Sequence, residues 1–104
     1  MPLTIKTAAD LAGEAQARTK VSITRAIDRY VEEQARALEY NSAAHLASYA
    51  ASTVPEWQAE AQAFVAWRDS VWVTALDILA DAEASGEVPS AEDVIAALPK
   101  WSDP

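Results

Sequence analysis

The sequence predicts an all-α protein: an elongated antiparallel hairpin or bundle of two long helices, plus two short helices. Glycine occurs only at positions 13 and 86, while alanine, glutamate, glutamine and arginine, which favour helices, are abundant. Apolar residues recur at helical spacing along two stretches of about thirty residues, each of which would span about 45 Å as a helix. Short connections between such helices favour antiparallel neighbours.

The length of 104 residues predicts a single helical domain covering 1–104, and no internal repeat is apparent. Residues 23–99 are expected to form its helical core, and 1–22 an N-terminal helix that can project from it. There is no cysteine, which excludes disulfides and thiolate chemistry. The start lacks a signal-peptide pattern, and no apolar run approaches the roughly 20 residues of a membrane helix. We therefore expect a cytosolic protein with no membrane partner.

The first helix is predicted to begin after Thr7, which can cap it, with Asp10 in the first turn. It runs to about Glu39. Its apolar face consists of residues at helical spacing, namely Ile23, Ile27, Tyr30, Val31, Gln34 and Leu38. Before Ile23 the same face offers only Ala9, Ala12, Gln16 and Thr19. This first part therefore frays, projects, or packs against another chain.

Two turn signals separate the first helix from the second long one. Asn41-Ser42 ends the first helix and caps a short helix over 43–50. In Thr53-Val54-Pro55-Glu56, Thr53 is expected to cap the next helix and Glu56 to complete a capping box, with Pro55 tolerated in the first turn.

The second long helix is predicted to run to about Ala84, where Gly86 favours a left-handed stop. Its stripe is Trp57, Ala61, Phe64, Trp67, Arg68, Val71, Trp72, Ala75, Ile78, Leu79 and Ala82. Ser90 is expected to cap a last helix through Leu98, which Pro99 ends. Trp101 can then fold back as a hydrophobic latch.

Arg68 is the one charged residue within this aromatic stripe. A buried guanidinium needs acceptors, and Glu33, Glu39 or a carbonyl near the short helix could supply them. Its flat face can also stack on Trp57, Trp67 or Trp72. The favoured interpretation is that Arg68 ties helices together and sets their register; the alternative is an interface arginine.

Four tryptophans are many for a chain of this length. Trp57 and Trp72 are expected to pack in the core, and Trp67 and Trp101 to act as surface anchors. The candidate partner-binding or packing anchors are therefore Trp67, Arg68, Trp72 and Trp101.

The net charge of −8 lies wholly in the second half of the chain. Residues 1–52 carry six basic and six acidic residues, and 53–104 carry two basic and ten acidic ones. This excess argues against phosphate binding there and suits either solubility or a basic partner.

Four arginines form a ridge opposite the apolar face of the first helix: Arg18, Arg25, Arg29 and Arg36. A nucleic-acid footprint is one interpretation. However, Glu14 and Glu32 each precede an arginine by four residues, which favours a solvated face with intrahelical pairs. Contact with the acidic face of a neighbouring copy is a further possibility. We expect no direct nucleic-acid binding.

Nothing in the sequence indicates catalysis, a cofactor or a metal. His45 is the only histidine, so no multi-histidine site exists. There is no phosphate loop, dinucleotide fingerprint or nucleophile elbow. The expectation is a protein that is not an enzyme, with no catalytic, cofactor-binding or metal-binding residues.

Three segments resemble a family of small proteins from tailed bacteriophages and prophages, encoded in the tail and tail-fibre region. They are YNSAAHLASYAAS (40–52), VPEWQAEAQAFVAWRDSVW (54–72) and VPSAEDVIAALP (88–99). The shared pattern is a YNS turn, a short helix, an F..WRD.VW helix and a closing P…LP segment, over about residues 23–99. The resemblance implies a place in tail biology, and it implies no catalytic residues.

The expected function is that of a tail-associated structural or assembly protein acting by protein–protein contact. Such a protein is either a minor tail or tail-fibre component or a tail-fibre assembly factor. Its partners would be other tail proteins or itself, in the host bacterial cytoplasm or incorporated in the virion tail. The alternative is a small acidic phage inhibitor, of the DNA-mimic or anti-defence type, that binds a basic host complex.

Overall fold

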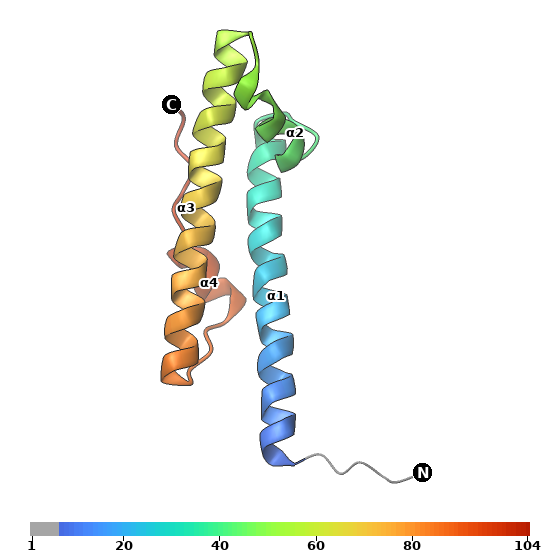
Figure 1. The fold of residues 1–104 in the computed structure, drawn as a ribbon, viewed down its shortest axis with the longest axis vertical. Coiled ribbons are helices and arrows are strands. Elements are labelled where there is room, and N and C mark those ends of the chain that lie inside the picture. Colours follow the sequence, from blue (N-terminus) through green and yellow to red (C-terminus); the bar gives the residue numbers. More distant parts are fainter. Residues whose placement is uncertain (1–6) are drawn as a thin grey trace, which may run out of the picture.

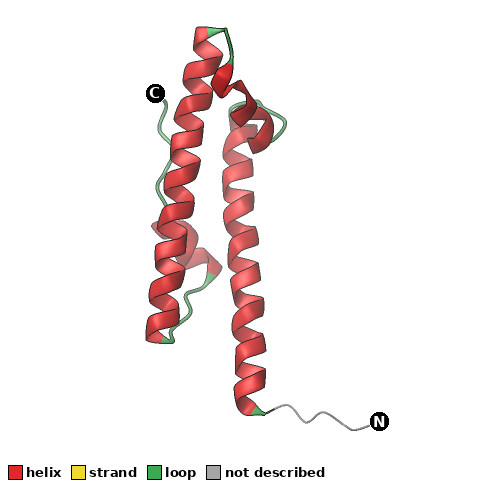
Figure 2. Cartoon of the chain, viewed as in Figure 1, coloured by secondary structure: helices red, strands yellow, loops and turns green. Residues whose placement is uncertain are grey.

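A computed structural model describes residues 7–104 as an elongated all-α hairpin, which confirms the predicted fold class. The long helices α1 (Ala8–Ala37) and α3 (Pro55–Ser85) run antiparallel (Figure 1). The helix α2 (Ala43–Ser48) and the 3-10 helix η1 (Tyr49–Ala51) connect them, and α4 (Ala91–Ala97) follows α3. No strand occurs in this described range (Figure 2). The molecule measures 62 × 33 × 19 Å.

A single apolar core joins all four α-helices. From α1 it takes every fourth residue, and from α3 residues at intervals of three and four, as one face of a helix requires. Leu46 of α2 and Val94 of α4 close it on two further sides. The buried residues of the long helices are Ile23, Ile27, Val31 and Ala35, then Ala61, Phe64, Trp67, Val71, Ala75, Leu79 and Ala82.

The start of α1 is capped as the sequence predicts. The Thr7 hydroxyl accepts from the Asp10 N–H at 3.1 Å, and the Thr7 N–H donates to the Asp10 carboxylate at 3.2 Å, forming a capping box. The first half of α1 is largely exposed up to Ile23. Its apolar face therefore buries little, as expected. The six residues of the 1–22 segment that precede Thr7 lie outside the described range.

The end of α1 comes two residues earlier than predicted. After Ala37 the chain turns through a left-handed residue, Glu39, at φ 73°. The Tyr40 N–H donates to the Ala35 carbonyl at 3.1 Å, and the Glu39 N–H donates to the Arg36 carbonyl at 2.9 Å. This is a Schellman closure with glutamate in the position that glycine usually takes. Asn41-Ser42 thus follows the helix end and does not cause it.

The short helix α2 is capped by Ser42, whose hydroxyl accepts from the His45 N–H at 3.0 Å, as expected. The carboxylate of Glu32, on α1, accepts from the Ala43 N–H at 3.1 Å and so adds a second cap from outside. The predicted helix over 43–50 is α-helical only to Ser48 and continues as η1.

The predicted cap of α3 is wrong. Val54, not Thr53, occupies the capping position, and no side chain caps the helix. Proline disfavours helical angles in the residue before it, so Val54 stays extended (φ −89°, ψ 112°) and the helix begins at Pro55. Glu56 is then one position too early for a capping box. The Ser52 hydroxyl instead accepts from the Val54 N–H at 3.1 Å.

The other two predicted boundaries are confirmed. Gly86 ends α3 in a left-handed conformation (φ 76°), and its N–H donates to the Ala82 carbonyl at 2.9 Å. Ser90 caps α4 by accepting from the Asp93 N–H at 3.1 Å. Among the described residues, none of the helices has the length and apolar character needed to cross a membrane.

Candidate functional site

The segment after α4 is fastened to both long helices through one backbone atom. The Tyr30 hydroxyl of α1 and the Trp67 indole N–H of α3 both donate to the Pro99 carbonyl oxygen, each at 3.0 Å. A carbonyl oxygen has two lone pairs, so it can accept both bonds. The rings of Tyr30 and Trp67 also lie with their centroids 5.5 Å apart. This cluster shows how the segment after α4 holds the two long helices together.

Trp101 folds back onto the hairpin, as the latch prediction required. Its ring lies edge-on to Trp67, with centroids 5.9 Å apart, and 6.3 Å from the centroid of Phe64. Trp67 itself is only 8% exposed, so its interpretation as a surface anchor is wrong; it is a core residue. Trp72 and Trp101 are half-buried against the core. The packing role of these three tryptophans is thus visible, and a partner-binding role stays a prediction.

Trp57 was expected in the core, and it is 49% exposed. It lies in the first turn of α3, which extends past the end of α1 (Figure 1). Its ring lies edge-on to Tyr49, at 5.8 Å between centroids. Tyr49 in turn contacts Tyr40 and His45, at 5.7 and 5.4 Å. An aromatic cluster therefore covers the end of the hairpin where the two long helices are connected.

Within this cluster, Tyr40 makes a strong hydrogen bond across the hairpin. Its hydroxyl donates to the Glu60 carboxylate of α3 at 2.7 Å. Burial, followed by this hydrogen bond and the nearby negative charge of Glu60, raises the pKa of Tyr40 to about 12. The neutral phenol is therefore favoured in the folded protein, and it ties the end of α1 to α3.

Arg68 does not tie helices together. Its Nε and Nη2 atoms both donate to Oδ1 of the adjacent Asp69, at 3.1 and 3.0 Å. Neither Glu33 nor Glu39 pairs with it within the described residues, and its side chain is 35% exposed. A long arginine stem lets the charged head leave an apolar stripe and reach solvent, so no buried acceptor is needed. An interface role for Arg68 stays a prediction.

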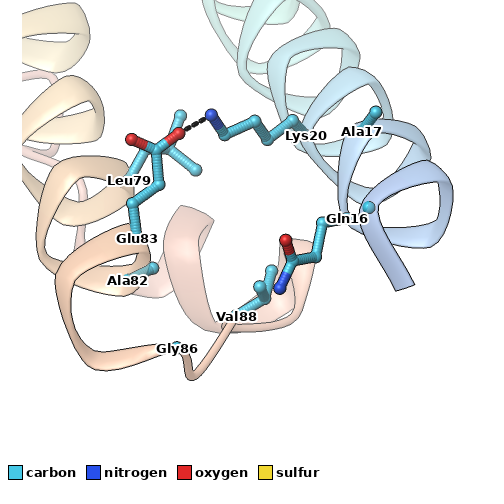
Figure 3. A pocket seen from close by; sticks show the side chains of 9 residues that line it. Gln16, Ala17, Lys20, Leu79, Ala82, Glu83, Gly86 and Val88 are labelled. Atoms are coloured by element: carbon cyan, nitrogen blue, oxygen red, sulfur yellow. Dashed lines mark ion pairs between the residues drawn. The ribbon is translucent and has the colours of Figure 1, made fainter. Parts of the chain in front are cut away.

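A hollow of about 350 Å³ separates the first half of α1 from the end of α3 (Figure 3). On the α1 side it is lined by Gly13, Gln16, Ala17 and Lys20, which are too small or too polar to fill it. Lys20 and Glu83 reach toward each other across the hollow and form an ion pair. The first part of α1 thus keeps one polar contact with α3.

The outer side of α3 carries a second apolar surface that points away from the core. Val73 and Leu76 are 60% and 58% exposed, and Val65 is half-buried nearby. At 100° per residue these positions lie on the side of the helix that α1 does not cover. A helix with apolar residues on two faces is typical of a helix that packs on two sides.

The outward ridge of α1 is basic. Arg18, Arg25, Arg29 and Arg36 are exposed, and none forms an ion pair with a carboxylate in the described part of the chain. Glu32, predicted to pair with Arg36, instead caps α2. Between Arg18 and Arg25 lies a shallow hollow lined also by Ala17, Val21 and Ser22. Leu11 and Val21 are the large apolar residues exposed on this helix.

Comparison of the chain with protein-family models, with curated proteins and with solved structures gives no match. Within residues 7–104, no group of three or more His, Asp or Glu side chains is arranged to hold a metal ion. The exposed surfaces of α1 and α3 are therefore the candidate contact surfaces of the described residues.

Sequence reasoning missed two features of the structure. The predicted stripe of the second long helix does not include Val73 and Leu76, although their helical positions indicate a second apolar face. The shared acceptor at Pro99 could not be found, because a backbone carbonyl carries no signal in the residue type.

Proposed function

We propose that this chain is a tail-associated bacteriophage protein that acts by protein–protein contact. It serves either as a minor component of the tail or tail fibre or as an assembly factor for the fibre. The resemblance of residues 23–99 to a family of the tail gene region supports the phage context. The contact mode is supported by one structural observation, the exposed apolar face of α3 around Val73 and Leu76.

The geometry favours contact over chemistry for a physical reason. The buried set of the described residues is entirely hydrophobic, and none of their charged side chains is fully buried. Exposed valine and leucine on one long helix lose unfavourable contact with water when a partner covers them. A rigid helix face that needs no rearrangement also loses little conformational entropy on binding.

The test uses a phage or prophage that encodes the chain. The gene is deleted, the particles are examined by electron microscopy, and purified wild-type particles are searched for the chain by mass spectrometry. Presence in the particle supports a tail component. Absence from the particle, with tails or fibres incomplete in the deletion, supports an assembly factor. Normal, infectious tails without the gene contradict the proposal.

A paired variant connects the result to the surface. Val73→Lys combined with Leu76→Lys places two charges on the outer face of α3 and should abolish incorporation or assembly while the helical content is kept. Ala59→Lys, at another exposed position of α3, is the matched control and should assemble normally. Salt-sensitive binding to a basic host complex, with tails unaffected, would instead support the acidic inhibitor.

A further inference from the structure

The outer side of α3 carries a ridge of alternating charge and apolar surface. Asp69, Val73, Asp77 and Asp81 follow one another at intervals of four residues, so they are neighbours along the helix surface. Val73 is 60% exposed, and the three aspartates are exposed on either side of it. We call these four residues the aspartate ridge. Its centre is an apolar side chain, with a carboxylate about 6 Å away along the axis in each direction.

The outer side of α1 carries a matching depression. Arg18, Val21, Ser22 and Arg25 occupy positions i, i+3, i+4 and i+7, the four positions that form a hole in knobs-into-holes packing. The same residues, with Ala17, line the shallow hollow on this helix. We call these four residues the arginine hole. Its floor contains an apolar side chain, and a guanidinium stands at each end.

We propose that the aspartate ridge of one copy packs into the arginine hole of a second copy of this chain. Val73 is the knob, and Asp69 and Asp77 pair with Arg18 and Arg25. The two arginines are seven residues apart, about 10.5 Å along the helix, and the two aspartates are eight apart, about 12 Å. A long arginine side chain absorbs this small difference.

The charge pattern also selects the relative direction of the two helices. With α1 and α3 of the two copies parallel, Arg29 and Asp81 form a third pair, because each follows the second pair by four residues. With the helices antiparallel, Arg29 would instead lie opposite Val65. Three ion pairs around an apolar contact favour the parallel arrangement, since complementary charges fix register.

The intrachain contacts leave these groups available. The side chains of Asp77 and Asp81 make no hydrogen bond or ion pair within the described residues, and neither do those of Arg18, Arg25 and Arg29. Asp69 holds Arg68 through one carboxylate oxygen, and its other oxygen can accept a further donor. In this arrangement, acidic residues from the second half of one chain contact basic residues from the first half of another.

This inference rests on the proposed action by protein contact and names one partner for it. Because ridge and hole are different surfaces, each copy that uses one keeps the other free. Such a heterologous contact closes into a ring or continues as a line, and it does not stop at a two-fold dimer. Surface charge pairs are screened by salt, so the assembly should weaken as ionic strength rises.

The experiment measures the mass of the purified chain by size exclusion with light scattering, over a range of protein concentration at low salt and at about 1 M salt, where the screening length is about 3 Å. The wild type should associate at low salt and dissociate at high salt. Arg25→Glu and Asp77→Arg should each weaken association at least about tenfold, since each places like charges together.

The decisive variant carries both changes, Arg25→Glu with Asp77→Arg. It exchanges the two charges and should restore association. Arg36→Glu makes the same charge change beyond the ridge and hole, and should associate like the wild type. Circular dichroism checks that every variant stays helical. A wild type that is monomeric at every concentration, or a double variant that fails to recover, overturns the proposal.

The outcome is separable from that of the proposed function. Association of the purified chain is measured without any phage component, while incorporation into particles is measured in infected cells. A monomer that still enters tails refutes only the self-contact. An oligomer from a gene that tails do not need refutes only the tail role.

Discussion

Trp67 and Tyr30, on the two opposite long helices, share a single hydrogen-bond acceptor, the carbonyl oxygen of Pro99. The two donors differ in surroundings. The Trp67 ring is buried in the core, whereas Tyr30 is half-buried and lies under the ammonium group of Lys100, 5.6 Å from the ring centroid. Loss of one donor leaves the acceptor satisfied by the other. Because Trp67 is buried and Tyr30 is only half-buried, removing the two donors should still lower the free energy of unfolding by different amounts.

Tyr30→Phe should lower the free energy of unfolding by about 1 kcal/mol, because it removes one hydrogen bond and leaves the ring in place. Trp67→Phe should lower it by about 2 kcal/mol, because it removes a bond and also leaves a void in the core. Urea unfolding followed by circular dichroism measures both. An equal cost for the two variants would show that Trp67 contributes no packing beyond its hydrogen bond.

The Tyr40–Glu60 hydrogen bond predicts a loss of stability at alkaline pH. The pKa of Tyr40 is raised from 10.0 to about 12 in the folded protein, so its contribution is complete below pH 10. Between pH 10 and 12 the unfolded chain loses the phenolic proton while the folded one keeps it, and stability falls. Unfolding should be measured across this range for the wild type and for Tyr40→Phe.

Tyr40→Phe should be less stable by about 1 kcal/mol at neutral pH, and the difference should shrink above pH 10. Glu60→Gln keeps an acceptor oxygen but removes the charge, so its alkaline loss should be smaller than that of the wild type. If the difference in unfolding free energy between the wild type and Tyr40→Phe stays constant up to pH 12, the Tyr40–Glu60 bond does not cause the alkaline loss.

Introducing glycine at one left-handed position and removing it at the other should change the free energy of unfolding in opposite directions. Glu39 holds a φ of 73° with a side chain that resists it, so Glu39→Gly should raise the free energy of unfolding by about 1 kcal/mol. Gly86, at φ 76°, has open space around it. Gly86→Ala should therefore lower the free energy of unfolding by about 1 kcal/mol, through backbone strain alone. Thermal unfolding of the two variants compares them, and a gain for both would refute the argument.

The helix caps provide a direct comparison between sequence rules and structure. Ser90→Ala should cost about 1 kcal/mol, because the hydroxyl satisfies the Asp93 N–H at the start of α4. Thr53→Ala should cost less than about 0.5 kcal/mol, because Thr53 is exposed and caps nothing. Chemical unfolding of both variants measures the difference. A larger loss of stability in Thr53→Ala than in Ser90→Ala would support the capping box that the sequence predicts.

The elements that could be predicted are those that depend on neighbouring residues alone. Thr7, Ser42, Ser90 and Gly86 act within one turn of the chain, and each does what its residue type favours. The predicted cap at Thr53 is wrong because two local preferences compete there. The restriction that proline places on Val54 outweighs the preference of threonine for the N-cap position.

The misplaced tryptophans have a different cause. Periodicity shows which face of α3 a residue occupies, but not how far the opposite helix extends. Both tryptophans belong to the predicted stripe, yet Trp67 is 8% exposed and Trp57 is 49% exposed. Trp57 lies in the first turn of α3, which extends past the end of α1. Likewise, the stripe could not show that Arg68 pairs with its own neighbour, because a flexible side chain reaches many acceptors.

The contacts along the hairpin also differ in how much chain they close. Glu32 reaches Ala43 over 11 residues and Tyr40 reaches Glu60 over 20, whereas Tyr30 reaches Pro99 over 69. Closing a longer loop costs more entropy. The end of the hairpin where α2 and η1 connect the long helices should therefore form early in folding, and the segment around Pro99 should dock late. Weakening the bond at Pro99 should then speed unfolding and leave the folding rate nearly unchanged. The segment after α4, which is held to both long helices through the Pro99 carbonyl, is therefore the last part of the described chain to take its place.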